Sequence, residues 1–105
     1  MQNKQYTEAG WKLFRIKIVE WQEAYMNKLN EEYIALLKGK NSSAQKFWKL
    51  HERIQHDKHK VGVVAEMRRS KLIENITFLL HEGAIKYEDL EEFSDELKET
   101  IRLFI

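Results

Sequence analysis

The sequence predicts an all-α protein, a small helical bundle of about four helices in an up-and-down or closely related arrangement, with a long first helix as its spine. The chain of 105 residues contains no proline, whereas average usage is about 5%, and long unbroken helices tolerate that composition better than turn-rich β folds. Apolar residues recur at steps of three and four along most of the chain, which is the spacing of one helix face. At this length we expect one domain, residues 1–105.

The strongest periodicity predicts the first helix, over residues 7–38. Thr7 is a suitable N-cap, and Lys38 with Gly39 supplies the stop. The apolar stripe of this helix consists of Trp11, Phe14, Ile18, Trp21, Tyr25, Leu29, Tyr33 and Leu36. A second flank, which we expect to be buried as well, consists of Ile16, Val19, Met26 and Leu37. The helix is long for a domain of this size, roughly 40 Å at ~1.5 Å per residue. Either it is the spine of the bundle, or its end projects and pairs with another chain.

Three shorter helices are expected at residues 43–57, 63–82 and 87–104. A polar loop at residues 41–43 offers caps for the second helix. The apolar face of that helix holds Ala44, Phe47, Trp48, His51 and Ile54. Gly83 fits the left-handed position after the third helix, with Ile85 folding back as its apolar contact. The stripe of the fourth helix stays in phase across Ser94, which predicts one helix with a kink at that residue.

Charge is segregated along the chain. Residues 1–37 are neutral, residues 38–71 carry ten Lys or Arg against three Asp or Glu, and residues 72–105 carry three against nine. The net charge of +1 therefore hides a basic middle segment of +7 and an acidic last segment of −6. Such blocks act on steering and partner choice rather than on the fold. They either pair with each other inside the chain or attract an external ligand.

Basic side chains gather around the junction of the second and third helices, where they are candidate partner or phosphate contacts. They are Lys58, Lys60, Arg68, Arg69 and Lys71. A helix–turn–helix would place such residues on DNA phosphates, with the second of its helices in the major groove. The connection is longer than that motif uses, and the domain is close to neutral. DNA binding is therefore the alternative rather than the leading interpretation.

The histidines allow two interpretations. Glu52, His56 and His59 fall on one helical face at i, i+4 and i+7, a set of ligands that Zn²⁺ accepts. Imidazole also has an ordinary role near a helix C-terminus, where its cation meets the negative end of the helix dipole. We favour the ordinary role, and we predict neither a metal ion nor a cofactor.

Catalytic signatures are missing from the sequence. It contains no GxGxxG, GxxxxGK[ST] or GxSxG motif and no cysteine nucleophile. The carboxylates of residues 88–99 fall on the polar face of an amphipathic helix, which is typical of a solvated surface. We therefore predict that the protein is not an enzyme and has no catalytic residues.

The aromatic residues of the first helix have a core interpretation and an interface interpretation. Trp11, Phe14, Trp21 and Tyr25 lie at helical spacing, which is typical of core. Large aromatic side chains also anchor interfaces, and the length of the helix makes a self-association face through these four residues the second interpretation.

We predict a non-enzymatic protein that acts through protein–protein contact, in a regulatory, adaptor or immunity-like role, with either a different protein or a second copy of itself, as a homodimer, for its partner. The alternative is a DNA-binding regulator. The longest apolar run is four residues, 34–37, so we expect no membrane-spanning helix and no membrane partner. A chain without cysteine suits a reducing compartment, and we predict a cytoplasmic location.

Overall fold

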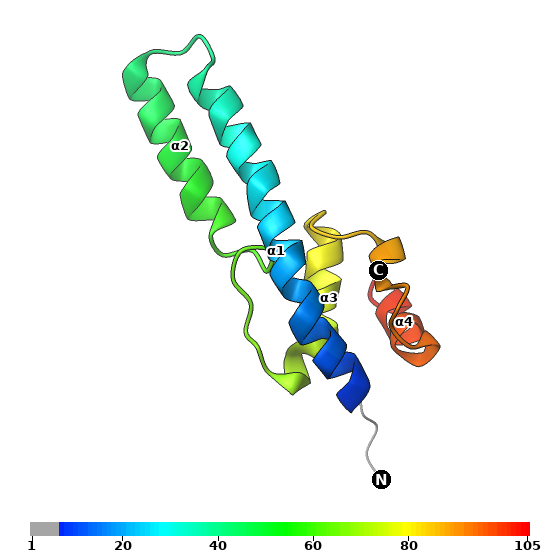
Figure 1. Cartoon of the computed structure of the whole chain (residues 1–105). Helices are drawn as coiled ribbons and strands as arrows, with labels where there is room; N and C mark the ends of the chain where they lie inside the picture. Colours follow the sequence, from blue (N-terminus) through cyan, green and yellow to red (C-terminus); the bar gives the residue numbers. More distant parts are fainter. Residues whose placement is uncertain (1–6) are drawn as a thin grey trace.

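The structure, a computed structural model, describes residues 7–105. Its elements are α1 (Glu8–Leu37), α2 (Ser43–Asp57), α3 (Leu72–His81) and α4 (Asp95–Arg102), with 3₁₀ turns η1 (Arg69–Lys71) and η2 (Tyr87–Leu90). No strand occurs in this part of the chain. The predicted small all-α bundle with a long first helix is confirmed (Figure 1).

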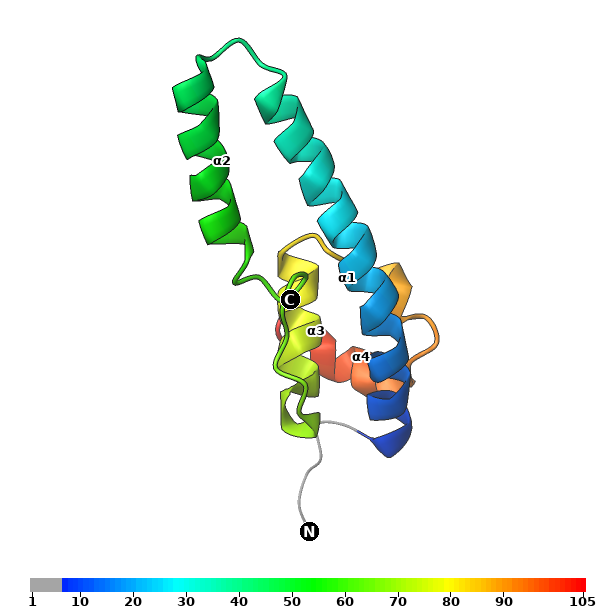
Figure 2. The same cartoon turned by 60° about the vertical axis from the view of Figure 1, so that its left-hand side comes forward.

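The molecule is elongated, with extents of 60 × 23 × 22 Å. The first half of α1 packs with α3 and α4 around the core, and the second half runs on beyond them (Figure 1). There α2 folds back beside α1, so that the two helices form a projecting hairpin (Figure 2). Of the two arrangements expected for the first helix, the projecting end is the one observed, and its neighbour is α2 of the same chain.

The ends of the first two helices are set by the caps that the sequence predicts. The Thr7 hydroxyl accepts a 2.9 Å hydrogen bond from the Gly10 amide, and α1 stops at Lys38. Ser42 and Gln45 form a reciprocal capping box at the start of α2. Because these caps satisfy backbone groups that the helices leave unpaired, both helices lie within one residue of the predicted bounds.

The core lies where α1 crosses α3, η2 and α4. Aromatic rings form a chain through it: Trp11 lies 6.1 Å from Phe14, Phe14 lies 6.2 Å from Trp21, and Trp21 lies 6.2 Å from Phe93, measured between ring centroids. Aliphatic side chains fill the space around these rings, namely Ile18, Leu72, Ile73, Ile76, Leu79, Ile85, Leu90, Leu97 and Ile101.

The predicted start of the third helix is wrong. Residues 65–68 have no regular structure, and α3 begins only at Leu72. Polar side chains hold residues 61–68 out of a helix. The Glu82 carboxylate accepts hydrogen bonds from the Val61 and Gly62 amides, and the Asn75 side-chain amide donates to the Glu66 carbonyl oxygen. These long-range bonds stabilise a conformation that local periodicity does not indicate.

The end of the third helix agrees with the sequence. Gly83 adopts a left-handed conformation with φ of 76°. The Ala84 and Gly83 amides donate to the carbonyl oxygens of Leu79 and Leu80, which is the hydrogen-bond pattern of a Schellman motif. Ile85 is buried against the core, as expected of its apolar contact.

The predicted fourth helix is interrupted rather than kinked. Residues 87–90 form η2, and α4 begins at Asp95. The Ser94 hydroxyl accepts a hydrogen bond from the Leu97 amide and caps a new helix. The apolar side chains on both sides of the break are buried, which is why their phase suggested one helix.

Candidate functional site

The four aromatic residues of the expected self-association face are buried inside the chain. Trp11, Phe14, Trp21 and Tyr25 are all at most 9% exposed. They are therefore part of the core or its margin, and this structure does not offer them to a second chain. The core interpretation of the stripe is the correct one.

A different side of α1 is open instead. Of the four residues expected to form a second buried flank, Ile16, Val19 and Leu37 are exposed, Val19 to 68%, and Met26 is half-buried. The core elements pack on the stripe that contains Phe14 and Trp21, and helical geometry at about 100° per residue places the second flank well away from that stripe. The expectation of burial failed because no helix within residues 7–105 covers this flank.

The apolar face of α2 is open too. Phe47 is 64% exposed and Trp48 60%, their ring centroids lying 5.1 Å apart, and Ile54 is exposed beside them. The side of α2 that faces α1 carries Leu50, Arg53 and Asp57, and of these three only Asp57 is buried. Polar contacts therefore set the rotation of α2 in the hairpin.

Those contacts converge on the Asp57 carboxylate, which is 2% exposed. The Tyr33 hydroxyl donates to Asp57 Oδ2 over 2.6 Å, and Arg53 Nη2 lies 3.4 Å from the same oxygen. His56 Nδ1 lies 3.2 Å and Lys60 Nζ 3.5 Å from Asp57 Oδ1. Arg53 also forms a 2.6 Å ion pair with Glu32 on α1. The base of the hairpin is thus held by one buried anion among three basic groups and a phenol.

The pKa values in this cluster follow from its geometry. Burial opposes ionisation of Asp57, but the hydrogen bonds from Tyr33 and His56, with the Arg53 and Lys60 cations, outweigh it and lower the pKa of the carboxyl below its usual value. Burial, together with the bond to a carboxylate, raises the pKa of Tyr33 to about 12. The cluster is ionised at Asp57 and neutral at Tyr33 near pH 7, the state in which their hydrogen bond is strongest.

The open flank of α1 and the open face of α2 lie on the same side of the hairpin. Each helix of an antiparallel pair has a line of residues that contacts the other helix. Residues rotated from that line in the same direction about their own helix axis point to the same side of the pair. Two shallow cavities support this placement. One of 230 Å³ lies between Met26 and Ile54, and one of 470 Å³ lies between Val19 and Val64, with Val63 lining both. We call this surface the hairpin face; it consists of Ile16, Val19, Ile34, Leu37, Phe47, Ile54, Val64 and Met67, with Trp48 at its outer edge, where its ring contacts that of Phe47.

The basic residues singled out in the sequence do not form one free patch. Lys60 pairs with Asp57, Arg68 with Glu66, Arg69 with Glu8 and Lys71 with Glu74. Lys58 caps the end of α2 and lines the smaller cavity of the hairpin face. Arg68 and Arg69 precede α3 rather than lie on it, so they are not on the helix that a helix–turn–helix would insert into DNA.

The two charge blocks do not lie against each other as blocks. Among residues 7–105, one ion pair, Lys71–Glu74, joins the basic middle segment to the acidic last segment. The acidic segment otherwise pairs with Lys17 of α1 through Glu92 and with itself through Lys98 and Asp95. Most of its carboxylates are exposed around η2 and α4, so negative charge gathers there, whereas positive charge gathers on the tip of the hairpin, where residues 38–50 carry four lysines and no acidic residue.

The histidines of α2 are not assembled as a metal site. Within residues 7–105, no three His, Cys, Asp or Glu side chains are placed to hold one ion. His56 Nδ1 faces Asp57, while Glu52 and His59 are exposed. The structure therefore does not bring Glu52, His56 and His59 together.

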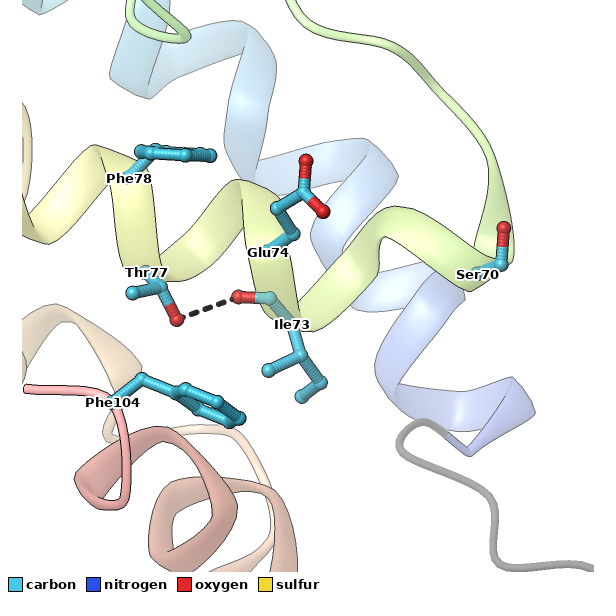
Figure 3. A pocket seen from close by; sticks show the side chains of 6 residues that line it. All are labelled: Ser70, Ile73, Glu74, Thr77, Phe78 and Phe104. Carbon is cyan, nitrogen blue, oxygen red and sulfur yellow. Dashed lines mark hydrogen bonds between the residues drawn. The ribbon is translucent and has the colours of Figure 1, made fainter.

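A further cavity of 300 Å³ lies beside α3 (Figure 3), lined by Ser70, Ile73, Glu74, Thr77, Phe78 and Phe104. The Thr77 hydroxyl donates to the Ile73 carbonyl oxygen over 2.8 Å, so its proton is engaged within its own helix. Of the residues lining this cavity, only Glu74 is ionisable, and it pairs with Lys71. The hairpin face is more extensive and is the stronger candidate. Comparisons with protein-family models, curated proteins and solved structures found no match to this chain.

Proposed function

We propose that the protein is a non-enzymatic interaction protein and that the hairpin face is the surface through which it contacts another protein chain. The observation that supports this is the size of the face. Nine large apolar side chains stand exposed here, seven on α1 and α2 and two, Val64 and Met67, on the segment that follows α2. The largest apolar patch of an ordinary monomer is about 300–600 Å², and larger patches mark interaction sites.

The composition and the rigidity of the face support the same function. Phe47 and Trp48 stand together near the tip, and aromatic side chains supply much of the energy at interface hot spots. The Tyr33–Asp57 bond and the Arg53–Glu32 pair fix the two helices relative to each other. A surface that is already ordered loses less conformational entropy when it binds.

Photo-crosslinking in cells tests this proposal. A photoreactive phenylalanine analogue is placed at Val19 on the hairpin face or at Leu103, which is 81% exposed elsewhere. We expect the Val19 position to give a discrete protein adduct, identified by mass spectrometry and weakened by the second substitution Leu37→Glu. Equal labelling from Val19 and Leu103, or no adduct from Val19, would contradict the proposal.

The location follows from a separate set of observations. Among the described residues, none of the helices combines the length and apolarity needed to cross a membrane. We further propose that the contact takes place in the cytoplasm, because a cysteine-free chain suits a reducing compartment.

DNA binding stays a prediction of the sequence, and the structure offers no separate observation in its favour. Four of its five candidate cations engage carboxylates of their own chain. A fluorescence titration against duplex DNA at ~50 mM salt tests it, because phosphate contacts give salt-sensitive affinity. Binding that weakens when Lys58 and Arg68 are replaced would revive this alternative.

A further inference from the structure

We infer that the occupant of the hairpin face is a second copy of this chain, packed antiparallel about a twofold axis that passes near Met26. This inference rests on the proposed function and specifies its partner. Three features of the structure support it: the area of the face, the matching shapes of its two ends, and the distribution of charge along it.

The area fits a dimer. The nine side chains of the hairpin face each expose more than two fifths of their surface, together on the order of 1,000 Å². A stable interface buries about 800 Å² on each partner. A second chain of the same kind therefore offers enough surface to cover the face.

The two ends of the face have complementary shapes. At the tip of the hairpin, Phe47 and Trp48 stand out as a pair of rings. At the base, the 470 Å³ cavity is open between Val19, Val64 and Met67. A twofold axis relates a surface to itself, so each contact it makes occurs twice. An axis midway between Ile16 and Leu37, near Met26, brings the tip of each chain onto the basal cavity of the other.

Charge selects the antiparallel arrangement. Residues 38–50 carry four lysines and no acidic residue, namely Lys38, Lys40, Lys46 and Lys49. A parallel dimer would place two such tips side by side, where like charges repel. An antiparallel dimer places the two lysine-rich tips at opposite ends of the assembly and so avoids this repulsion.

Sedimentation equilibrium of the purified full chain tests whether it forms a dimer. We expect a dimer at micromolar concentration, and at least a tenfold weaker self-association for Leu37→Glu and for Val19→Glu. Leu103→Glu is the matched control, since that side chain is more exposed and lies outside the face; it should dimerise like the parent chain. Because all three positions are on the surface, circular dichroism should show unchanged helicity.

Disulfide mapping tests the arrangement, because the chain has no cysteine of its own. Met26→Cys lies at the proposed axis and should give a covalent dimer on mild oxidation. Leu37→Cys alone should not, but an equimolar mixture of Leu37→Cys and Ile16→Cys chains should. Lys28→Cys, two residues from Met26 on the other side of the helix, is the negative control. Efficient coupling of Leu37→Cys to itself would show a parallel dimer and overturn the antiparallel inference.

The remaining outcomes separate this inference from the function that it specifies. A chain that stays monomeric up to about 100 μM overturns the dimer, whereas an adduct from Val19 with a different protein in cells would leave the interaction function intact. A monomer that floats with vesicles of phosphatidylglycerol and phosphatidylcholine, and loses this binding with Trp48→Ala, would assign the face to a lipid surface. That result would overturn both proposals.

Discussion

The Tyr33 hydroxyl on α1 donates a 2.6 Å hydrogen bond to the carboxylate of Asp57, the last residue of α2. This bond joins the two helices of the hairpin where α2 meets the rest of the molecule. It orients α2 so that Leu50 and Arg53 turn toward α1, while Phe47 and Trp48 remain outside. The exposed face of the hairpin is therefore a consequence of a polar contact.

Removing the Tyr33 hydroxyl should destabilise the protein. We expect Tyr33→Phe to lower the free energy of unfolding by about 1.5–3 kcal/mol, because the bond ends on a buried charged acceptor. Tyr87→Phe is the matched control: the Tyr87 hydroxyl is buried without a hydrogen-bond partner, so its loss should cost little or nothing. Urea unfolding followed by far-ultraviolet circular dichroism measures both, and equal losses would contradict the role given to Tyr33.

Acid should weaken the hairpin through Asp57. Since the pKa of Asp57 is lower in the folded chain than its ordinary value of 3.8, its contribution to stability is present above that value. The contribution is lost as pH falls through the lower, folded pKa. We expect Asp57→Asn to be less stable near neutral pH and less sensitive to pH between about 5 and 2. The control is Asp95→Asn, at a fully exposed carboxylate, which should keep the parent profile.

Alkaline pH should destabilise the folded protein through Tyr33. The pKa of Tyr33 in the folded chain is about 12, above its ordinary value of 10.0. This phenol therefore favours the folded state below pH 10 and loses that contribution as pH rises toward 12. An ultraviolet titration of phenolate absorbance should show one tyrosine ionising late. That late step should be absent in Tyr33→Phe; if it persists there, another tyrosine is responsible.

Gly62 should not tolerate a side chain. A Cβ atom at this position would overlap the ring of Tyr25, which is buried, while the Gly62 amide is tied to Glu82. We expect Gly62→Ala to cost about 1–3 kcal/mol, the usual range for overpacking. Gly83→Ala meets no atom within 4 Å and should cost about 1 kcal/mol, from its left-handed backbone alone. Thermal unfolding of the two variants compares these causes, and a neutral Gly62→Ala would mean that Tyr25 moves aside easily.

Among the substitutions compared here, truncation of Ile76, which is fully buried on α3, should destabilise the protein most. Ile76→Ala should lower the free energy of unfolding by about 2–5 kcal/mol. Lys58→Ala, at an exposed position, should stay within about 0.5 kcal/mol of the parent chain. Lys60→Ala should cost more than Lys58→Ala, because Lys60 lies 3.5 Å from the buried Asp57 carboxylate. Chemical denaturation distinguishes all three.

Much of the fold can be predicted from local signals. The caps at Thr7 and Ser42, the stop at Gly83 and the two first helices follow from short patterns in which side chain and backbone are close in sequence. Such patterns act within a few residues, so they can be recognised without knowledge of the rest of the chain.

Two features could not be predicted in this way. Residues 61–68 are held outside a helix by hydrogen bonds to side chains from later in the chain, namely Glu82, which accepts from the Val61 and Gly62 amides, and Asn75, which donates to the Glu66 carbonyl oxygen. The flank at Ile16 and Val19 is apolar at helical spacing, but periodicity shows only that a face is apolar and not whether the chain supplies something to cover it. The candidate interaction surface includes this uncovered flank, so the sequence alone could not identify it.

The uneven burial of the helices has a consequence for motion. Helix α2 contributes one buried side chain, Asp57, whereas α3 contributes five. Regions with few buried contacts open more readily than the core does, and their amide protons exchange with solvent sooner. In a solitary chain, the amides of α2 should therefore exchange with deuterium well before those of α3, even though both helices are fully formed.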